Sequence, residues 1–380
     1  MANTKKQAPK KEAIKYWNTK RIDSTKAKIR IVYGMRSNGK TTACLLKGLE
    51  KTIKTLDGRH EQTVYLRRWE DEVKPKNDIA SLYNGILKFY NIEKKTKGKY
   101  NTIIYRARKF YLAKVEEAKT VDIDTTPLCI CMALSQNEHY KSLSYPDVTT
   151  LIFDEFLSEN HQYLPNEFKR FTSILSTVIR SRTDVEIYLC GNTVDLNSIY
   201  WNEFRIIELF KKMKEGDIVH YKPKNRQTDI AVEWAESVDI EGRVLNVYTD
   251  FDTQNSAMIN KGEWDTDNYP HLPYSYEKAD IRFYFFILYN YETYQCEVIK
   301  KNGVEFIYIH RKTTPIQDED KDLIYSTDFT PAPNRFINLF KPETYVQQKI
   351  VNLFNTSKVF YQDNIVGDAI DSYLQWCRKY

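Results

Sequence analysis

Two glycines, a lysine and a threonine near the start of the chain have a spacing that suits phosphate binding. The stretch Gly34-Met35-Arg36-Ser37-Asn38-Gly39-Lys40-Thr41 has the P-loop pattern GxxxxGK[ST]. In this pattern the glycines let backbone amides converge on phosphate oxygens, the lysine reaches the β- and γ-phosphates, and the hydroxyl holds Mg²⁺. The sequence therefore predicts a site for ATP and Mg²⁺, whose loop residues are Gly34, Arg36, Ser37, Asn38, Gly39, Lys40, Thr41 and Thr42.

A pair of carboxylates, Asp154-Glu155, follows the apolar stretch 148–153. More than a hundred residues after a P-loop, this is the Walker B pattern with its adjacent glutamate. We expect Asp154 to share Mg²⁺ with Thr41 and Glu155 to orient and polarise an attacking water. Because only water needs such an orienting acid, the pair favours hydrolysis over transfer to a bound acceptor.

Polar residues also end two other predicted strands. Asn192 follows the apolar stretch 185–190, where it could sense the γ-phosphate, form a turn, or do both. Arg67 and Arg68 end the stretch 63–66, and strand ends beside a P-loop face the active site. Either arginine could therefore contact phosphate or relay its state; the alternative is a surface salt bridge.

The elements that must position these residues alternate between strand and helix patterns. Residues 29–33 suit a strand and the apolar residues after the P-loop recur at helical spacing, which places the phosphates at a helix N-terminus. Residues 79–92 also have helical spacing. We predict an α/β fold, a P-loop ATPase domain of the ASCE type with a central, mostly parallel sheet. Before the first strand, Tyr16 and Trp17 could stack on adenine or pack against this core.

Length and composition indicate a globular chain of two domains. It has 380 residues, of which 42% are hydrophobic and 28% charged, with a net charge of +6. No apolar run approaches the roughly 20 residues that a membrane span needs, and the N-terminus lacks an apolar signal core, so we expect a soluble protein with no membrane partner. The six cysteines have no metal-ligand spacing, and buried free thiols are expected.

Changes in pattern along the chain suggest three regions. We expect the ATPase domain over residues 1–202, a linker over 203–245 and a C-terminal domain over 246–380. In the last, Asn302-Gly303 predicts a hairpin and residues 342–356 and 365–378 predict helices, which together indicate a small α+β domain.

Four lysines gather on one predicted turn, at Lys94, Lys95, Lys97 and Lys99. Such a cluster is either a solvated face or a contact for a polyanion, and an attached nucleotide motor makes nucleic acid a reasonable partner. The Lys-rich residues 1–12 have the same two interpretations.

Several stretches in order resemble one family. The P-loop, Phe153-Asp154-Glu155-Phe156, Tyr163-Leu164-Pro165-Asn166-Glu167 and Val178-Ile179-Arg180-Ser181-Arg182 are similar to the genome-packaging ATPases of phi29-type bacteriophages. The resemblance implies a homo-oligomeric ring, generally a pentamer, that works in the host cytoplasm, docks at the portal vertex of an empty prohead and drives double-stranded DNA inward. It also implies contact with the portal or with a structural packaging RNA.

The resemblance assigns further residues. Arg180 matches the arginine finger that completes a neighbouring subunit's site, and Lys141 matches another basic residue acting across that interface. One departure is the acidic run Glu70-Asp71-Glu72, which stands where a relative carries a lysine, so no DNA contact is transferred there. Larger viral packaging motors carry an RNase H-like nuclease, and the C-terminal domain resembles a reduced, inactive version of it.

Two other functions remain open from the sequence. One is a helicase-like translocase that works on exposed nucleic acid, which strand displacement without proheads would favour. The other is an ATP-gated assembly scaffold without catalysis, which normal function after Glu155→Gln would favour.

Overall fold

A computed structural model describes residues 16–75, 78–158, 163–192, 198–206, 209, 212–222, 228–236, 268–273, 275–289, 292–327 and 332–379. The basic tail 1–12 lies outside these residues. The chain divides into two compact units, one formed by residues 1–194 with 211–263 and the other by residues 195–210 with 264–380.

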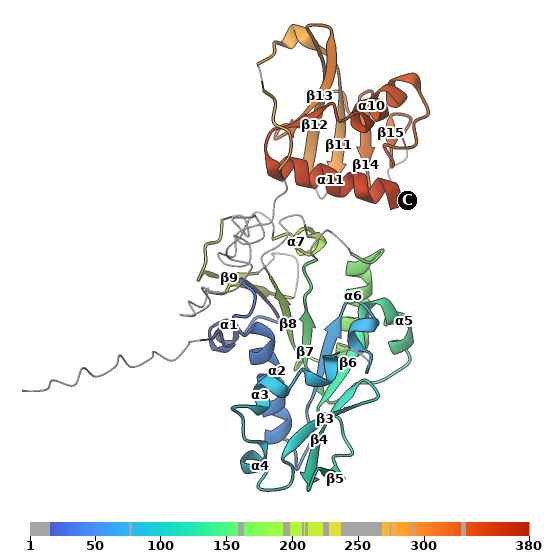
Figure 1. Ribbon diagram of the computed structural model, residues 1–380. Coiled ribbons are helices and arrows are strands. Elements are labelled where there is room, and N and C mark those ends of the chain that lie inside the picture. The colour runs from blue at the N-terminus through green and yellow to red at the C-terminus, as the bar shows by residue number, and fades with distance from the viewer. Residues whose placement is uncertain are drawn as a thin grey trace, which may run out of the picture. The chain divides into compact units, whose positions relative to one another are not determined.

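The first unit is built on one large mixed sheet (Figure 1). Among the described residues it has ten strands: β1 (Ile29–Tyr33), β2 (Gln62–Arg67), β3 (Thr102–Arg106), β4 (Lys109–Glu116), β5 (Lys119–Ile123), β6 (Cys129–Ala133), β7 (Val148–Asp154), β8 (Glu186–Gly191), β9 (Ile218–Tyr221) and β10 (Ile230–Trp234). Their order is β3-β4-β6-β2-β7-β8-β1-β10-β9, with β5 paired to β4. The middle strands, from β6 to β10, are parallel, as the sequence predicts, and the outer strands are antiparallel.

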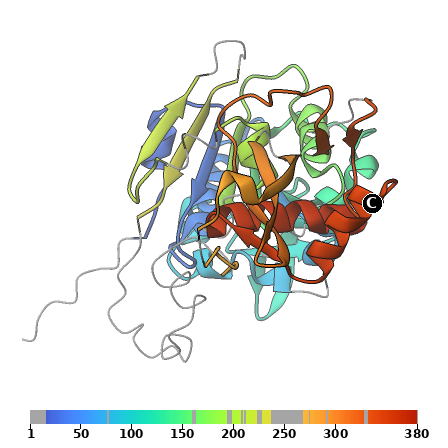
Figure 2. The ribbon, with the colours of Figure 1, turned by 90° about the horizontal axis from the view of Figure 1, so that it is seen from above.

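Strands β9 and β10 correct the predicted linker. They fall within residues 203–245, yet β10 pairs in parallel with the P-loop strand β1, and β9 forms the edge of the sheet. Figure 2 shows the two strands side by side, and β10 is the one next to β1.

Helices cover both faces of this sheet. On β7, Ile152 belongs to the apolar core under α2 (Lys40–Lys54), whereas the next residue, Phe153, stacks on Phe171 of α6 (Glu167–Ile179) with ring centroids 5.5 Å apart. Successive side chains of a strand point to opposite faces of the sheet, so a strand that is buried along its whole length packs against helices on both faces. The parallel sheet is therefore the middle of three layers.

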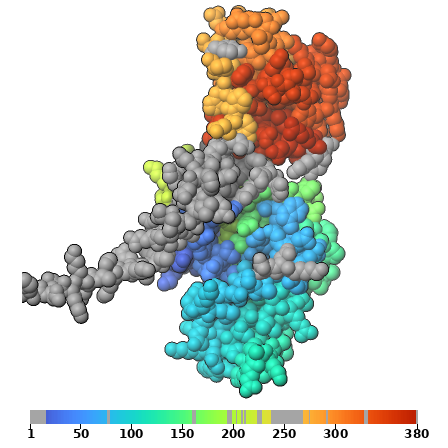
Figure 3. Space-filling model, viewed as in Figure 1, coloured from blue at the N-terminus to red at the C-terminus, as the bar shows by residue number. Residues whose placement is uncertain are grey.

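The segment predicted as one helix over 79–92 is broken. It forms the 3-10 helix η2 (Asp78–Ser81) and the short helix α3 (Asn84–Leu87), and α4 (Ile92–Lys95) follows. Most apolar residues of the segment are still buried or partly buried against the core, which explains the helical spacing, whereas Phe89 is exposed. Helix α4 and the hairpin strands β3 to β5 lie together at one end of the unit (Figure 3).

Over the described part of the first unit, the remaining short helices are α1 (Lys20–Ser24) and α5 (Asn137–Tyr140), with η1 (Asp71–Val73) and η3 (Leu134–Gln136). The second unit includes α7 (Ile199–Glu203).

The second unit has a sheet of order β15-β14-β11-β12-β13-β16 over the residues that the structure describes. Its elements are η6 (Lys278–Asp280), β11 (Ile281–Tyr289), β12 (Glu292–Lys301), β13 (Val304–Arg311), β14 (Leu323–Ser326), β15 (Arg335–Phe336), α10 (Tyr345–Asn355), β16 (Val359–Tyr361) and α11 (Asn364–Lys379). The predicted hairpin is confirmed: Asn302 and Gly303 both have positive φ, 48° and 80°, between antiparallel β12 and β13. Helices α10 and α11 share a separate apolar core with the sheet.

All six cysteines are free and buried, as expected. Within the described ranges no helix is long and apolar enough to cross a membrane.

Candidate functional site

The predicted chemical residues meet at the carboxyl edge of the parallel sheet. In the β1–β8–β7 register, Tyr33 lies opposite Gly191, and Asp154 lies opposite Cys190. The P-loop after β1, the acidic pair at the end of β7 and Asn192 after β8 therefore leave the sheet at one edge. Parallel strands place their carboxyl ends together, so pairing alone brings residues 34, 154 and 192 into one region.

The glycines of the P-loop are required by its backbone. Gly34 has φ 151° and Gly39 has φ 92°, values that residues with a side chain rarely adopt. A Cβ on Gly34 would also lie 2.8 Å from the carbonyl oxygen of Ala235. Any larger residue at these positions would distort the loop.

Lys40 is buried at the centre of the loop. Its Nζ donates to the carbonyl oxygens of Gly34 (2.9 Å) and Met35 (2.8 Å) and to Oδ1 of Asn38 (3.1 Å). Burial lowers the pKa of Lys40 to about 8, and the charges of nearby groups, Asp154 among them, oppose this shift. A cation held in so dry a site favours an anionic ligand that would neutralise it.

Thr41 and Asp154 lie in direct contact although 113 residues separate them. The Thr41 Oγ1 donates to Asp154 Oδ1 over 2.8 Å, and Tyr65 OH donates to Asp154 Oδ2 over 2.8 Å. Burial and the charge of Asp154 raise the pKa of Tyr65, so its hydroxyl stays protonated as a donor. A hydroxyl and a carboxylate are hard oxygen ligands, the donor set that suits Mg²⁺. Together with the loop around Lys40, these residues fit the predicted Mg²⁺ and nucleotide.

Glu155 pairs with Arg67, the last residue of β2. Its backbone has φ 53° and its side chain is 58% exposed. Arg67 Nη2 lies 2.6 Å from Glu155 Oε2, its Nη1 lies 3.5 Å from Asp154 Oδ2, and the same guanidinium pairs with Glu72. Arg67 thus contacts both site acids and is largely buried, unlike an ordinary surface pair, and its predicted contact with phosphate or relay of its state stays a prediction.

Arg68 has a different environment from its neighbour. It is buried against Glu167 at the start of α6, with an Nε–Oε2 distance of 2.9 Å. Its other nitrogens donate to the carbonyl oxygens of Glu155 (3.1 Å) and Phe156 (2.5 Å). Arg68 therefore fixes the backbone that follows β7 and does not contact the pocket described next.

These loops line one pocket of about 810 Å³. The predicted residues on its wall are Arg36, Ser37, Asn38, Gly39, Lys40, Thr41, Thr42, Asp154, Glu155 and Asn192. Other residues on its wall were not predicted as site residues from the sequence, among them Asn18, Leu46, Lys88 and Phe89. The helical spacing did not indicate Phe89 as a pocket residue, because in a continuous helix Phe89 would lie on the same buried face as Ile86.

Comparison with known proteins identifies the chain's relatives. The family model of the podovirus DNA encapsidation protein (Gp16) matches residues 11–377. This chain belongs to that family. Among Gp16-like relatives, the DNA packaging protein of Bacillus phage PZA is 24% identical over 302 residues, 77% of this chain and 78% of that protein. The DNA packaging protein of Bacillus phage B103 is 31% identical over 182 residues, 47% of this chain and 48% of that protein.

Solved structures share the fold of this Gp16 family member. Chains from the Phi-28 gp11 DNA packaging motor and from the bacteriophage Phi-29 viral genome packaging motor assembly each align with a TM-score of 0.57 and 19% identity. Both alignments cover 96% of this chain and at least 98% of the other. The mixed α/β architecture with a large, mostly parallel sheet is thus that of packaging-motor chains.

Arg180 and Lys141 lie outside the pocket that the P-loop lines in this Gp16-family chain. Arg180 ends α6, and its Nη2 donates to the carbonyl oxygen of Leu143 over 3.0 Å. Lys141, two residues before Leu143, pairs with Glu138 at 2.6 Å. Helix α6 returns the chain from the carboxyl end of β7 to the amino end of β8, so Arg180 stands at the edge of the sheet opposite Asp154.

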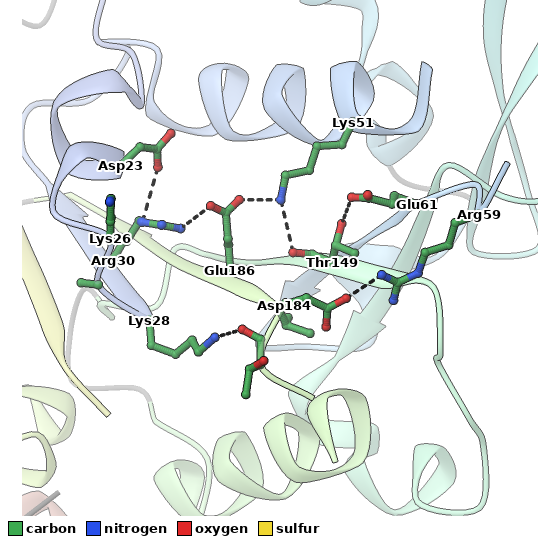
Figure 4. A pocket seen from close by; sticks show the side chains of 13 residues that line it. Asp23, Lys26, Lys28, Arg30, Lys51, Arg59, Glu61, Thr149, Asp184 and Glu186 are labelled. Carbon is green, nitrogen blue, oxygen red and sulfur yellow. Dashed lines mark hydrogen bonds and ion pairs between the residues drawn. The ribbon is translucent and has the colours of Figure 1, made fainter. Parts of the chain in front are cut away.

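A second pocket, of about 550 Å³, lies at that amino edge (Figure 4). Its charges pair with one another: Arg30 lies 3.4 Å from Asp23 and 3.0 Å from Glu186, and Lys51 also bonds Glu186. On the other wall, Arg59 pairs with Asp184 at 2.6 Å. Because opposite charges pair within the cluster, we assign it to the stability of the fold.

Proposed function

We propose that this protein is an ATPase motor that translocates double-stranded DNA into an empty prohead through the portal vertex. The observation that carries the proposal is the 2.8 Å contact between Thr41 and Asp154, with Lys40 and Glu155 on the same pocket. Membership of the DNA encapsidation family and the packaging names of its relatives support the DNA substrate. An ASCE-type arrangement is supported by β8, which lies between the P-loop strand and β7.

Different residues of the chain have different roles in ATP hydrolysis. Lys40 and the loop amides hold the β- and γ-phosphates, while Thr41 and Asp154 hold Mg²⁺, which when bound neutralises charge on the phosphate oxygens. Glu155 accepts a hydrogen bond from the attacking water and so orients and polarises it. Asn192, at the end of the adjacent strand, is placed to sense the γ-phosphate.

The site is completed by a neighbouring subunit in a ring, generally of five. Arg180 stands at the sheet edge opposite Asp154, and β7 alone spans about 20 Å at the rise of a strand, beyond the reach of one side chain. Arg180 therefore acts in trans, where it stabilises charge developing on the γ-phosphate, and Lys141 joins it at the same interface. The bond from Arg180 to Leu143, close in sequence to Lys141, supports a shared surface for the two.

The second unit binds the portal or a structural packaging RNA. Its antiparallel meander β11–β12–β13, with β14 parallel to β11, supports a reduced RNase H-like fold. The aspartates near its last helix have structural partners: Asp363 caps α11 through the Val366 amide, and Asp368 accepts from Tyr269. A role in binding is thus favoured over two-metal cleavage. The working protein resides in the host cytoplasm, at the prohead vertex.

The test is ATP hydrolysis by mixed variants at several protein concentrations, with and without double-stranded DNA. Glu155→Gln keeps Arg180, and Arg180→Ala keeps Glu155, so each is expected to be inactive alone and the mixture active. Turnover that is independent of concentration, without rescue on mixing, would contradict a shared site. DNA packaging into purified proheads, lost in both variants, tests the coupled reaction.

A further inference from the structure

Two exposed aromatic side chains line the pocket that the P-loop also lines. Tyr16 is 50% exposed and Phe89 is 64% exposed, and they come from segments more than seventy residues apart. Single exposed aromatic residues are common on proteins. Two exposed aromatic residues on the wall of one pocket, beside a phosphate-binding loop, indicate a ligand with a flat apolar part.

The position of Tyr16 is fixed by the P-loop itself. The Trp17 amide donates to the carbonyl oxygen of Asn38 over 3.0 Å, and the Trp17 side chain packs against the apolar core. Tyr16 touches Gly39 so closely that a Cβ there would lie 3.3 Å from the Tyr16 Cβ and 3.5 Å from its Cδ1. The tyrosine ring is therefore held next to the loop that would bind the phosphates.

Phe89 is presented by an anchored turn. Its amide donates to the carbonyl oxygen of Ile86 over 3.1 Å, as does the amide of Tyr90 over 2.9 Å. Ile86 and Tyr83 are buried in the core and anchor the turn, whereas the Phe89 side chain is exposed to solvent. Leu46 of α2 adds an apolar side chain to the same pocket.

We propose that Tyr16 and Phe89 form the subsite for the purine base of the nucleotide. This inference rests on the proposed function, since it takes the triphosphate to lie on the P-loop. Aromatic side chains bind bases by stacking on their π-faces, and an alanine substitution at such a contact weakens binding roughly fivefold to a hundredfold. A purine presents a larger face than a pyrimidine, so purine nucleoside triphosphates bind more tightly than pyrimidine ones.

The test compares two ligands on the full-length protein in the presence of Mg²⁺: ATP, which carries a base, and inorganic tripolyphosphate, which does not. Phe89→Ala and Tyr16→Ala should each raise the Kd for ATP about tenfold and leave the Kd for tripolyphosphate unchanged. Phe89→Trp should retain ATP affinity. Tyr345→Ala, which removes an 85% exposed aromatic of the second unit, is the matched control and should change neither Kd.

The outcomes separate the two proposals. If the wild type binds tripolyphosphate but neither alanine variant weakens ATP, the base subsite is wrong and the phosphate site stands. Equal weakening of ATP and tripolyphosphate would also overturn the subsite, because the aromatics would then support the loop rather than contact the base. If the wild type binds neither ligand, the proposed ATPase function itself fails.

Discussion

Arg67 and Glu155 form an ion pair of 2.6 Å in which the arginine is largely buried and the glutamate largely exposed. The same guanidinium also lies near Asp154 and Glu72, so three carboxylates share one cation at the edge of the pocket. The side chain of Glu155 is therefore held by a residue of the neighbouring strand β2.

We expect Arg67→Ala to lower kcat for ATP hydrolysis about tenfold, because an unrestrained carboxylate spends less time in the orientation that water activation requires. Arg67→Lys keeps the charge but loses the planar fork, and an intermediate kcat is expected. Steady-state kinetics on the assembled protein measure both. A higher kcat in Arg67→Ala would instead mean that Arg67 restrains Glu155 from acting.

The buried ion pair between Arg68 and Glu167 is expected to contribute to the free energy of unfolding. Glu167→Gln would leave a buried guanidinium without its counter-charge, and we expect the free energy of unfolding to fall by about 3 kcal/mol. Urea denaturation measures the change. Glu116→Gln, which breaks a solvent-exposed pair with Lys114, is the control and should leave the free energy of unfolding almost unchanged. A loss for Glu167→Gln as small as that of the control would show that Arg68 does not hold the backbone after β7.

The charge cluster of Figure 4 predicts a pH dependence. Burial opposes the charged form of Glu186, but the hydrogen bond from Lys51 and the charges of Lys51, Arg30 and Lys47 lower its pKa from 4.5 to about 2. A lowered pKa stabilises the folded state fully above pH 4.5, and the contribution is lost as the pH falls through about 2.

Glu186→Gln should therefore lower the free energy of unfolding at pH 7 by about 2 kcal/mol. Wild type and variant should converge as the pH falls below 4.5. Thermal unfolding at a series of pH values checks this. A difference that is constant across the series would show that Glu186 acts through packing and not through its charge.

The lysine cluster on and after α4 predicts a salt effect. We expect the double variant Lys94→Gln, Lys97→Gln to reduce DNA-stimulated ATP turnover. We also expect its DNA-binding constant to depend less on salt: the slope of the logarithm of that constant against the logarithm of the salt concentration should become shallower by about 2, because each phosphate contact contributes about 0.9. Lys321→Gln, an exposed lysine of the second unit, is the control. Unchanged turnover and slope in the double variant would assign the cluster to a solvated face.

The local pattern of the sequence determined much of this protein. The P-loop needs glycine at positions 34 and 39, the apolar stretch before Asp154 is a buried strand, and Asn302-Gly303 makes the hairpin. These features depend on the local backbone conformation and on the local pattern of apolar residues, and the residues adjacent in the sequence determine both. The approach of Thr41 to Asp154 was also predictable, because parallel strands align their carboxyl ends.

Only the tertiary structure decided the rest. Arg67 and Arg68 are the same residue type and adjacent, and their different roles come from partners, Glu155 and Glu167, that lie far along the chain. Residues 230–234 become a strand because β1 offers an edge, which local polarity cannot reveal. Phe89 is exposed in the pocket because tertiary packing breaks the helical pattern after Ile86. Each of these depends on contacts between distant segments, and the sequence around a residue does not contain them.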